Sequence, residues 1–179
     1  MYIYLIITIL VSLIALAVAA LFAREVLRAD TGTPRMQEVA AAIREGAEAF
    51  IRRQYTTIAI LAVVVALLIF AVYLIAGNFN TASHTAVAFV FGAFCSGLAG
   101  LIGMWIAVRA NLRSAAAART SAGRAIVLAL RGGAVSGLTI VALSLLGVSL
   151  IFLAFGANPT QTPFLIVGFG FGASFIALF

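Results

Sequence analysis

Few side chains in this sequence could carry chemistry, and they are not grouped. The chain has one cysteine, Cys95, and one histidine, His84, and neither has another His, Cys or acid close by in the sequence. The five acids all lie within residues 24–53, interspersed with arginines. A magnesium site needs several oxygen ligands in one place, so we predict no metal-binding, catalytic or substrate-binding residue in this chain.

A glycine run near the end of the sequence resembles, at first sight, a phosphate-binding loop. Gly168, Gly170 and Gly172 alternate with phenylalanines, but no lysine and no preceding strand pattern accompany them, as such loops require. We therefore interpret the run as a helix-packing surface. Ser174 lies one turn beyond Gly170 and is our one candidate for a neighbour of an ion path, although a lone serine in a membrane helix usually bonds to its own backbone.

The distribution of charge is more informative than any motif. Residues 24–53 hold six arginines and the five acids, residues 109–131 hold the other five arginines, and there is no lysine. The stretches 1–23, 54–108 and 132–179 carry no charge at all. Because an unpaired charge in hydrocarbon costs several kcal/mol, charge-free apolar stretches of this length indicate membrane spans of roughly 20 residues each.

The predicted fold class is an all-α membrane protein, a polytopic helical bundle with five spans in a single transmembrane domain. A mean hydropathy of +1.23 and 65% hydrophobic residues exclude an ordinary soluble domain. The net charge of +6 does not indicate a nucleic-acid partner, because the arginines flank apolar spans; the lipid bilayer is the expected partner. A cleaved secretory signal remains the alternative for the first span. The expected spans are residues 2–22, 55–76, 86–108, 134–155 and 163–179.

The arginines also predict the orientation of the chain. The segments 24–53 and 109–131 hold all 11 arginines, whereas the connections 77–85 and 156–163 hold none. The positive-inside rule therefore places the two Arg-rich loops in the cytoplasm and the N-terminus outside, in the plasma membrane.

Within the first of these segments we expect a helix. Thr33 and Pro34 form a helix start, with threonine as the N-cap and proline at the first helical position. Arg44 and Glu48, and then Glu48 and Arg52, are spaced to pair on one face. We predict that this helix continues directly into the second span.

Small residues recur at helical spacing in three spans. In lipid, small side chains let helix backbones approach closely, and van der Waals packing then holds the helices together. The candidate helix-packing residues are Gly92, Ser96, Gly100 and Gly103 in the third span, Gly133 and Gly137 in the fourth, and Gly168 and Gly172 in the fifth.

Four segments of the sequence together are similar to one family, the membrane-integral inorganic pyrophosphatases that pump H⁺ or Na⁺. The order and spacing of the segments carry the resemblance, which covers the chain from about residue 36 onward. The segments are residues 44–55 (Arg-Glu-Gly-Ala-Glu-Ala-Phe, then Arg-Gln-Tyr), 102–118, 131–138 and 168–179.

The resemblance implies more than the residues themselves show. It implies, by fold-level analogy, a subunit of about sixteen spans that works as a homodimer. It also implies Mg²⁺ and pyrophosphate held by acidic cytoplasmic residues, with hydrolysis coupled to outward pumping of H⁺ or Na⁺. Those acidic motifs follow the fifth span in the family, so we expect this chain to be an N-terminal fragment, completed by further C-terminal spans and inactive alone.

Two other functions stay open from the sequence. One is a subunit of a different polytopic transporter, which predicts charged coupling residues within the spans or an inverted repeat. The other is a non-enzymatic membrane scaffold that is complete as written. The uncapped apolar end at Phe179 argues against the scaffold.

Overall fold

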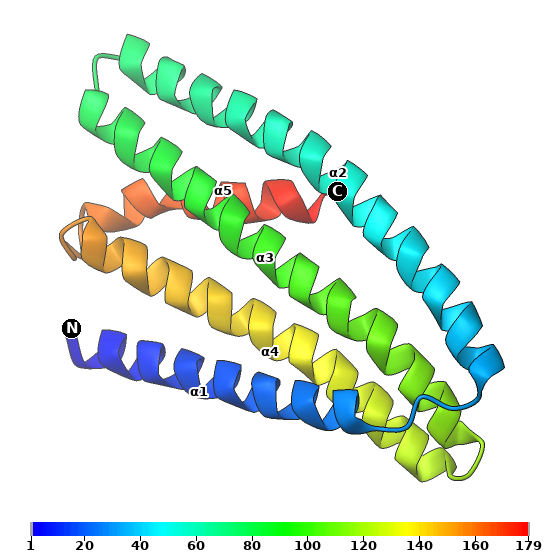
Figure 1. Ribbon diagram of the computed structural model, residues 1–179. Coiled ribbons are helices and arrows are strands. Elements are labelled where there is room, and N and C mark those ends of the chain that lie inside the picture. The colour runs from blue at the N-terminus through cyan, green and yellow to red at the C-terminus, as the bar shows by residue number, and fades with distance from the viewer. Residues whose placement is uncertain (1, 179) are drawn as a thin grey trace. The chain divides into compact units, whose positions relative to one another are not determined.

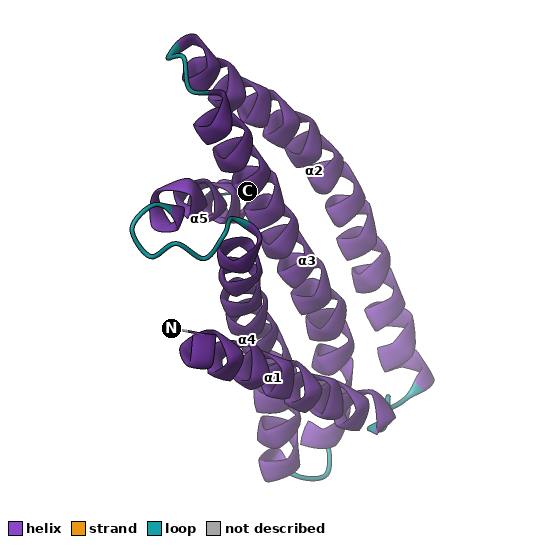
Figure 2. Cartoon of the chain, turned by 90° about the vertical axis from the view of Figure 1, so that its left-hand side faces the viewer, coloured by secondary structure: helices purple, strands orange, loops and turns teal. Residues whose placement is uncertain are grey.

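The computed structural model of the protein describes residues 2–178, and within that range the chain is helical with short connections and no strand (Figures 1 and 2). This confirms the predicted all-α membrane class. The five helices are α1 Tyr2–Arg28, α2 Pro34–Ile75, α3 Phe79–Ala118, α4 Ala122–Ala154 and α5 Thr162–Ala177.

Four of the helices, α1 to α4, are long and apolar enough to cross a membrane, judged by length and composition. The fifth, α5, is apolar but has only 16 residues, fewer than the roughly 20 that a span requires. The fifth predicted span therefore falls on a shorter helix, and its last residue, Phe179, lies outside the described residues. The positions at which the helices leave the bilayer stay predictions.

The Arg-rich segment 109–131 is not a loop, contrary to our expectation. Helix α3 continues to Ala118 and α4 begins at Ala122, so only residues 119–121 form a turn. The reason is local: alanine and arginine are strong helix formers, and residues 115–118 are four consecutive alanines. The segment therefore presents its arginines on rigid helix ends.

The chain divides into two compact units, and helices α1 to α4 each contribute to both. The first unit comprises residues 1–12, 53–98 and 143–179. The second unit comprises residues 13–52 and 99–142. The first unit contains the α2–α3 and α4–α5 connections, and the second contains the α1–α2 and α3–α4 connections.

In the second unit, α1, α3 and α4 share one apolar core. Val26 on α1 and Ile106 on α3 are fully buried, and Leu128 and Val135 of α4 pack with them. Helix α2 does not take part, since none of residues 34–52 is buried. The charged first half of α2 therefore lies outside this core.

In the first unit, α3 and α5 touch backbone to backbone. A Cβ atom added at Gly92 would collide with the carbonyl oxygen of Phe169, and one added at Gly172 would collide with that of Phe89. Gly168 lies in the same way against the carbonyl of Thr85. Only glycine permits so close an approach of two helices.

This close approach seats the ring of Phe169, which is 4% exposed, in the core of the first unit. The ring lies over Gly147 of α4, where an added Cβ would be 2.6 Å from two ring carbons. Ala88, Cys95 and Ile151 complete the cluster around it. Glycines on three helices thus create the space for one aromatic side chain.

Substitution of Gly172 by alanine tests the α3–α5 contact. We expect Gly172→Ala to lower the free energy of unfolding by roughly 1–3 kcal/mol, because the new methyl group collides with the rigid backbone of α3. Gly170→Ala is the matched control: its Cβ would meet nothing within 4 Å, and alanine favours a helix over glycine by about 1 kcal/mol. Thermal unfolding of the full-length gene product in detergent measures both, and equal effects would contradict the packing described here.

Candidate functional site

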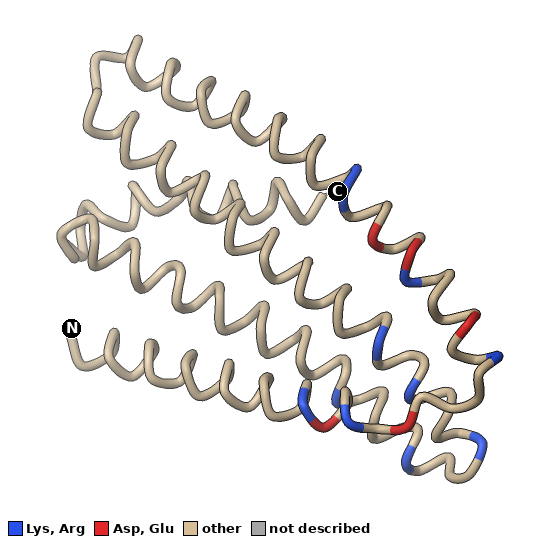
Figure 3. Tube along the Cα trace, viewed as in Figure 1, with Lys and Arg blue, Asp and Glu red and all other residues tan. Residues whose placement is uncertain are grey.

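The charged residues gather around the α1–α2 and α3–α4 connections and along the first half of α2, almost all of them in the second unit (Figure 3). Of all the charged residues, Arg53 alone belongs to the first unit. We call residues 24–38 and 109–131 the basic end of the second unit. Its charged side chains are the candidates for binding a ligand.

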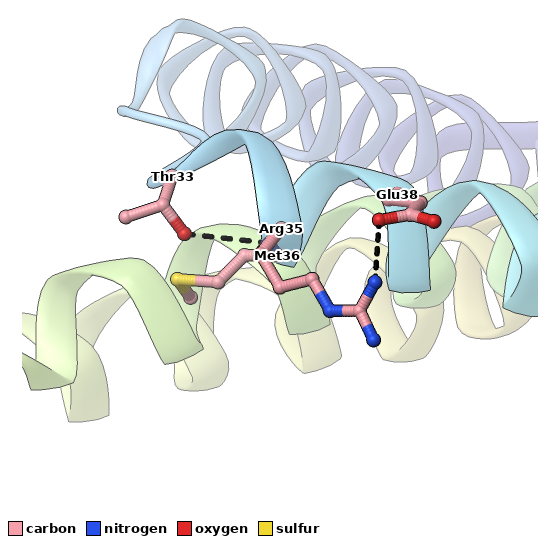
Figure 4. A network of polar contacts seen from close by, with 4 residues as sticks. All are labelled: Thr33, Arg35, Met36 and Glu38. Atoms are coloured by element: carbon pink, nitrogen blue, oxygen red, sulfur yellow. Dashed lines mark hydrogen bonds and ion pairs between the residues drawn. The ribbon is translucent and has the colours of Figure 1, made fainter.

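Helix α2 starts at the basic end as the sequence predicts. The Oγ1 of Thr33 accepts a hydrogen bond from the backbone N–H of Met36 at 3.4 Å, and Pro34 is the first helical residue (Figure 4). One turn on, Arg35 and Glu38 form an ion pair at 2.8 Å. The helix runs without a break to Ile75, which confirms that the charged segment and the second predicted span are one helix.

Arg113 of α3 closes the C-terminal end of α1. Its Nε and Nη2 both donate to the carbonyl oxygen of Leu27, at 3.3 and 3.1 Å, while Nη1 donates to the carbonyl of Arg109 at 2.9 Å. The last carbonyls of a helix have no partner within the helix and carry its partial negative charge, which a guanidinium offsets. Burial and the positive charge of Arg109 lower the pKa of Arg113 from its ordinary value, but an arginine stays charged at neutral pH.

Two further arginines are fixed by neighbours in the second unit. Arg131 of α4 forms an ion pair with Glu25 of α1 at 2.9 Å, and its guanidinium lies 5.8 Å from the centre of the Phe22 ring. The guanidinium of Arg109 stacks over Trp105 at 4.3 Å from the ring centre. The sequence did not reveal these roles. The one signal in the sequence was that residues 109–131 hold five arginines and no acid, so any carboxylate that pairs with them lies on another segment, as Glu25 does for Arg131.

Cavities lined by described residues open at the basic end and beside the neighbouring part of α2. One, of about 260 Å³, lies between α2 and α3 and is lined by Arg44, Arg109 and Arg113 among others. A second, of about 390 Å³, lies between the same helices and is mainly apolar, with Met36 and Leu112 in its wall. A third, of about 250 Å³, lies beside the α3–α4 turn.

The residues present do not fit a magnesium ion. Within residues 2–178, no three His, Cys, Asp or Glu side chains come together as ligands. The carboxylates of Glu25, Glu38 and Glu48 are instead paired with arginines. No step of catalysis can be derived from this donor set.

Ser174, His84 and Cys95, which the sequence analysis considered singly, do not form a site together. Ser174 is exposed on α5. The Nδ1 of His84 lies 2.7 Å from the carbonyl oxygen of Asn80, and its ring packs edge-on against Phe155. Cys95 lies in the core of the first unit.

The candidate packing glycines fall into different environments. Gly92, Gly168 and Gly172 lie against backbone, and Gly103 lies against Ser136 of α4, with an added Cβ 3.3 Å from its Oγ. Gly133 and Gly137 have nothing within 4 Å of an added Cβ among the described residues, and the neighbouring Gly132 makes the contact instead, against Ala110. Ser96 is half-buried and Gly100 is exposed.

Helices of this length and composition, with every charge confined to segments 24–53 and 109–131, define a polytopic integral membrane protein. A family model described as inorganic H⁺ pyrophosphatase matches residues 13–179, so the chain belongs to this family. The family expected from the four sequence segments is thereby confirmed.

Several curated proteins are similar to the chain along most of its length. It is 57% identical over 169 residues to "K(+)-insensitive pyrophosphate-energized proton pump 2" of Moorella thermoacetica, covering 93% of this chain and 24% of that protein. It is 46% identical to a protein of Methanosarcina mazei with the same description but no number, over 95% of this chain and 24% of the relative. It is 38% identical to "Pyrophosphate-energized membrane proton pump 3" of Arabidopsis thaliana, over 94% and 24%. The chain therefore spans about a quarter of the length of these relatives.

The contact of Arg113 with α1 can be tested by a charge-conserving substitution. We expect Arg113→Lys to lower the free energy of unfolding by about 1–2 kcal/mol, because a lysine ammonium cannot reproduce the two-nitrogen contact with the Leu27 carbonyl. Arg28→Lys serves as the control, since Arg28 is exposed and its side chain has no partner among residues 2–178. Thermal unfolding of the full-length gene product compares them, and no difference between the two would show that the contact contributes nothing.

Proposed function

We propose that this chain forms the first helices of a membrane pump that couples hydrolysis of pyrophosphate to outward transport of H⁺. The observation that carries the proposal is the family match over residues 13–179. The names of the relatives, pyrophosphate-energized proton pumps, favour H⁺ over Na⁺, and the description "K(+)-insensitive" favours a pump that needs no potassium.

Within the pump, this chain would supply membrane-spanning helices and not the residues that bind the substrate. Its described acids are scattered or paired with arginines, and the relatives are about four times longer. We therefore assign Mg²⁺ and pyrophosphate to residues outside this chain, where Mg²⁺ would neutralise phosphate charge and activate a water. Helices α1 to α5 would contribute the wall of a bundle that further C-terminal spans complete, and by family resemblance the pump is a homodimer.

This proposal replaces the two alternatives left open by the sequence. A different transporter or a scaffold has no support from the family match, and neither is needed to explain any feature of the helices.

An activity assay tests the proposed function. The full-length gene product in sealed inside-out membrane vesicles should hydrolyse added pyrophosphate when Mg²⁺ is present and should acidify the vesicle lumen, with no stimulation by K⁺. Residues 1–179 alone should show neither activity. Phosphate release and quenching of a pH-sensitive dye measure the two activities. Hydrolysis without acidification, or activity of residues 1–179 alone, would refute the proposal in this form.

We also propose that the basic end of the second unit faces the cytoplasm of a plasma-membrane protein, with the N-terminus outside. The support is the count of 11 arginines in segments 24–53 and 109–131 against none in 77–85 and 156–163. The α3–α4 turn would then be cytoplasmic and the α4–α5 connection external.

Cysteine labelling tests this orientation. In a Cys95→Ala background, we expect Gln161→Cys to react with an impermeant thiol reagent added to intact cells, and Ala122→Cys to react only after the cells are opened. Both positions are exposed, and neither substitution removes a side-chain hydrogen bond, because Gln161 makes no capping bond and alanine has no polar group. The reverse labelling pattern would place the basic end outside.

A further inference from the structure

The cavity beside the α3–α4 turn has an unusual lining for its size. Its volume is about 250 Å³, and the charged groups in its wall are Arg113, Arg119, Arg124 and Asp30. Three positive charges face one negative charge, so the cavity has a local surplus of two positive charges. Ala116 and Leu128, both buried, form part of its apolar floor.

Two of the three guanidiniums are uncommitted. The side chains of Arg119 and Arg124 make no hydrogen bond or ion pair within residues 2–178, and both are exposed. Arg113 is held by the Leu27 carbonyl and contributes a fixed charge to the floor. Asp30 forms no ion pair with these arginines among the described residues; its Oδ1 accepts a hydrogen bond from the backbone N–H of Gly32 at 3.2 Å.

The backbone at this place adds to the positive potential. Helix α4 has 33 residues and begins at Ala122, within the turn that borders the cavity. The Oγ of Ser121 accepts the N–H of Arg124 at 3.3 Å, and the N-terminal end of a helix attracts anions through its dipole and free N–H groups. Arg124 lies in the first turn of α4, so its guanidinium and this helix end act on the same space.

We propose that this cavity binds a phosphate group. Arginine presents a planar fork of donors that matches phosphate oxygens two at a time, and two uncommitted forks beside a third fixed charge suit an anion with several oxygens. A volume of about 250 Å³ is below the roughly 300–1,000 Å³ of pockets for larger ligands, so the ligand is a phosphate with a small attached group. This site is separate from the pyrophosphate site of the proposed function, which needs clustered acids.

The phosphate can come from two sources. The predicted spans end at residue 108 and begin again at residue 134, so Arg113 and Leu128 lie five and six residues beyond them. At about 1.5 Å rise per residue, the floor of the cavity lies less than about 10 Å from the hydrocarbon edge, near the outer side of the headgroup layer. The backbones of Arg119 and Arg124 lie about 15 Å out, so their long side chains would reach back toward a lipid headgroup. An anionic lipid headgroup and a soluble phosphate compound share the chemistry that the cavity recognises, and the experiment separates them.

The test uses the full-length gene product in detergent without Mg²⁺ and with EDTA, so that magnesium-dependent phosphate binding elsewhere is silent. Retention of phosphatidylglycerol in native mass spectrometry probes the lipid source, and calorimetric titration with inorganic phosphate probes the soluble one. In the double variant Arg119→Gln and Arg124→Gln, we expect whichever probe binds to lose affinity roughly tenfold or more, because two charge-assisted contacts are lost.

The matched control removes the same charge elsewhere at the basic end. Arg24→Gln with Arg28→Gln also neutralises two exposed arginines, which do not line the cavity, and binding should change by less than about twofold once salt screens long-range effects. The pair Arg119→Lys and Arg124→Lys should retain part of the affinity, since the charge stays but the forks are lost. If the double variant does not fold, Arg119→Gln alone replaces it.

The outcomes show whether the cavity binds phosphate and, if it does, which source supplies it. Loss of lipid retention in the cavity variant but not in the control supports a headgroup site, and the same selective loss for inorganic phosphate supports a soluble ligand. Absence of saturable binding of both probes to the unmodified protein, or equal loss in the two double variants, overturns the proposal. Neither result bears on pyrophosphate hydrolysis, so failure here leaves the proposed function intact.

Discussion

The constraint on which this structure depends is the cost of placing charge in hydrocarbon. It leaves three stretches of the chain without any charged residue and forces every arginine and acid into segments 24–53 and 109–131. Those segments could have been loops, but alanines and arginines favour helix, so the helices carry their charges beyond the predicted spans. The basic end is therefore made of rigid helix ends, and cavities with defined walls can form between them.

A second consequence concerns packing. In lipid, apolar side chains gain little from burial against each other, so helices associate through close contact of small residues. Large apolar residues such as Leu67 and Phe171 are accordingly exposed, at 62% and 64%. The tightest contact in the first unit is between backbones, at Gly92 and Gly172. The second unit, which holds every charged residue except Arg53, also has polar contacts between helices. Arg113 donates to the Leu27 carbonyl and Arg131 pairs with Glu25, and both contacts hold α1.

Much of this fold could be predicted from the sequence, because charge exclusion and helix-start signals are local. The helical class and the start of α2 at Thr33-Pro34 follow from such signals and are confirmed. The turn at residues 119–121 was missed because Arg-rich composition was taken to indicate a loop. The choice of Gly132 rather than Gly133 for contact with Ala110 depends on the rotation of α4 about its axis, and small-residue spacing alone does not determine that rotation. The bond from Arg113 to Leu27 joins residues 86 apart in sequence, and no spacing rule reveals it.

The arginines of residues 109–131 do not all have the same role, and the structure shows which of them contact α1 and which line a cavity. The positive-inside rule requires only that positive charge lie on one side of the membrane, and any position along the segment would satisfy it. Arg113 and Arg131 have a further role, because each offsets the charge of a specific group on α1. Arg119 and Arg124 have no such partner among residues 2–178, yet both line one cavity next to the start of α4. Guanidiniums that only set orientation would lower their mutual repulsion by lying apart, so their convergence on one cavity favours a ligand that carries the opposite charge.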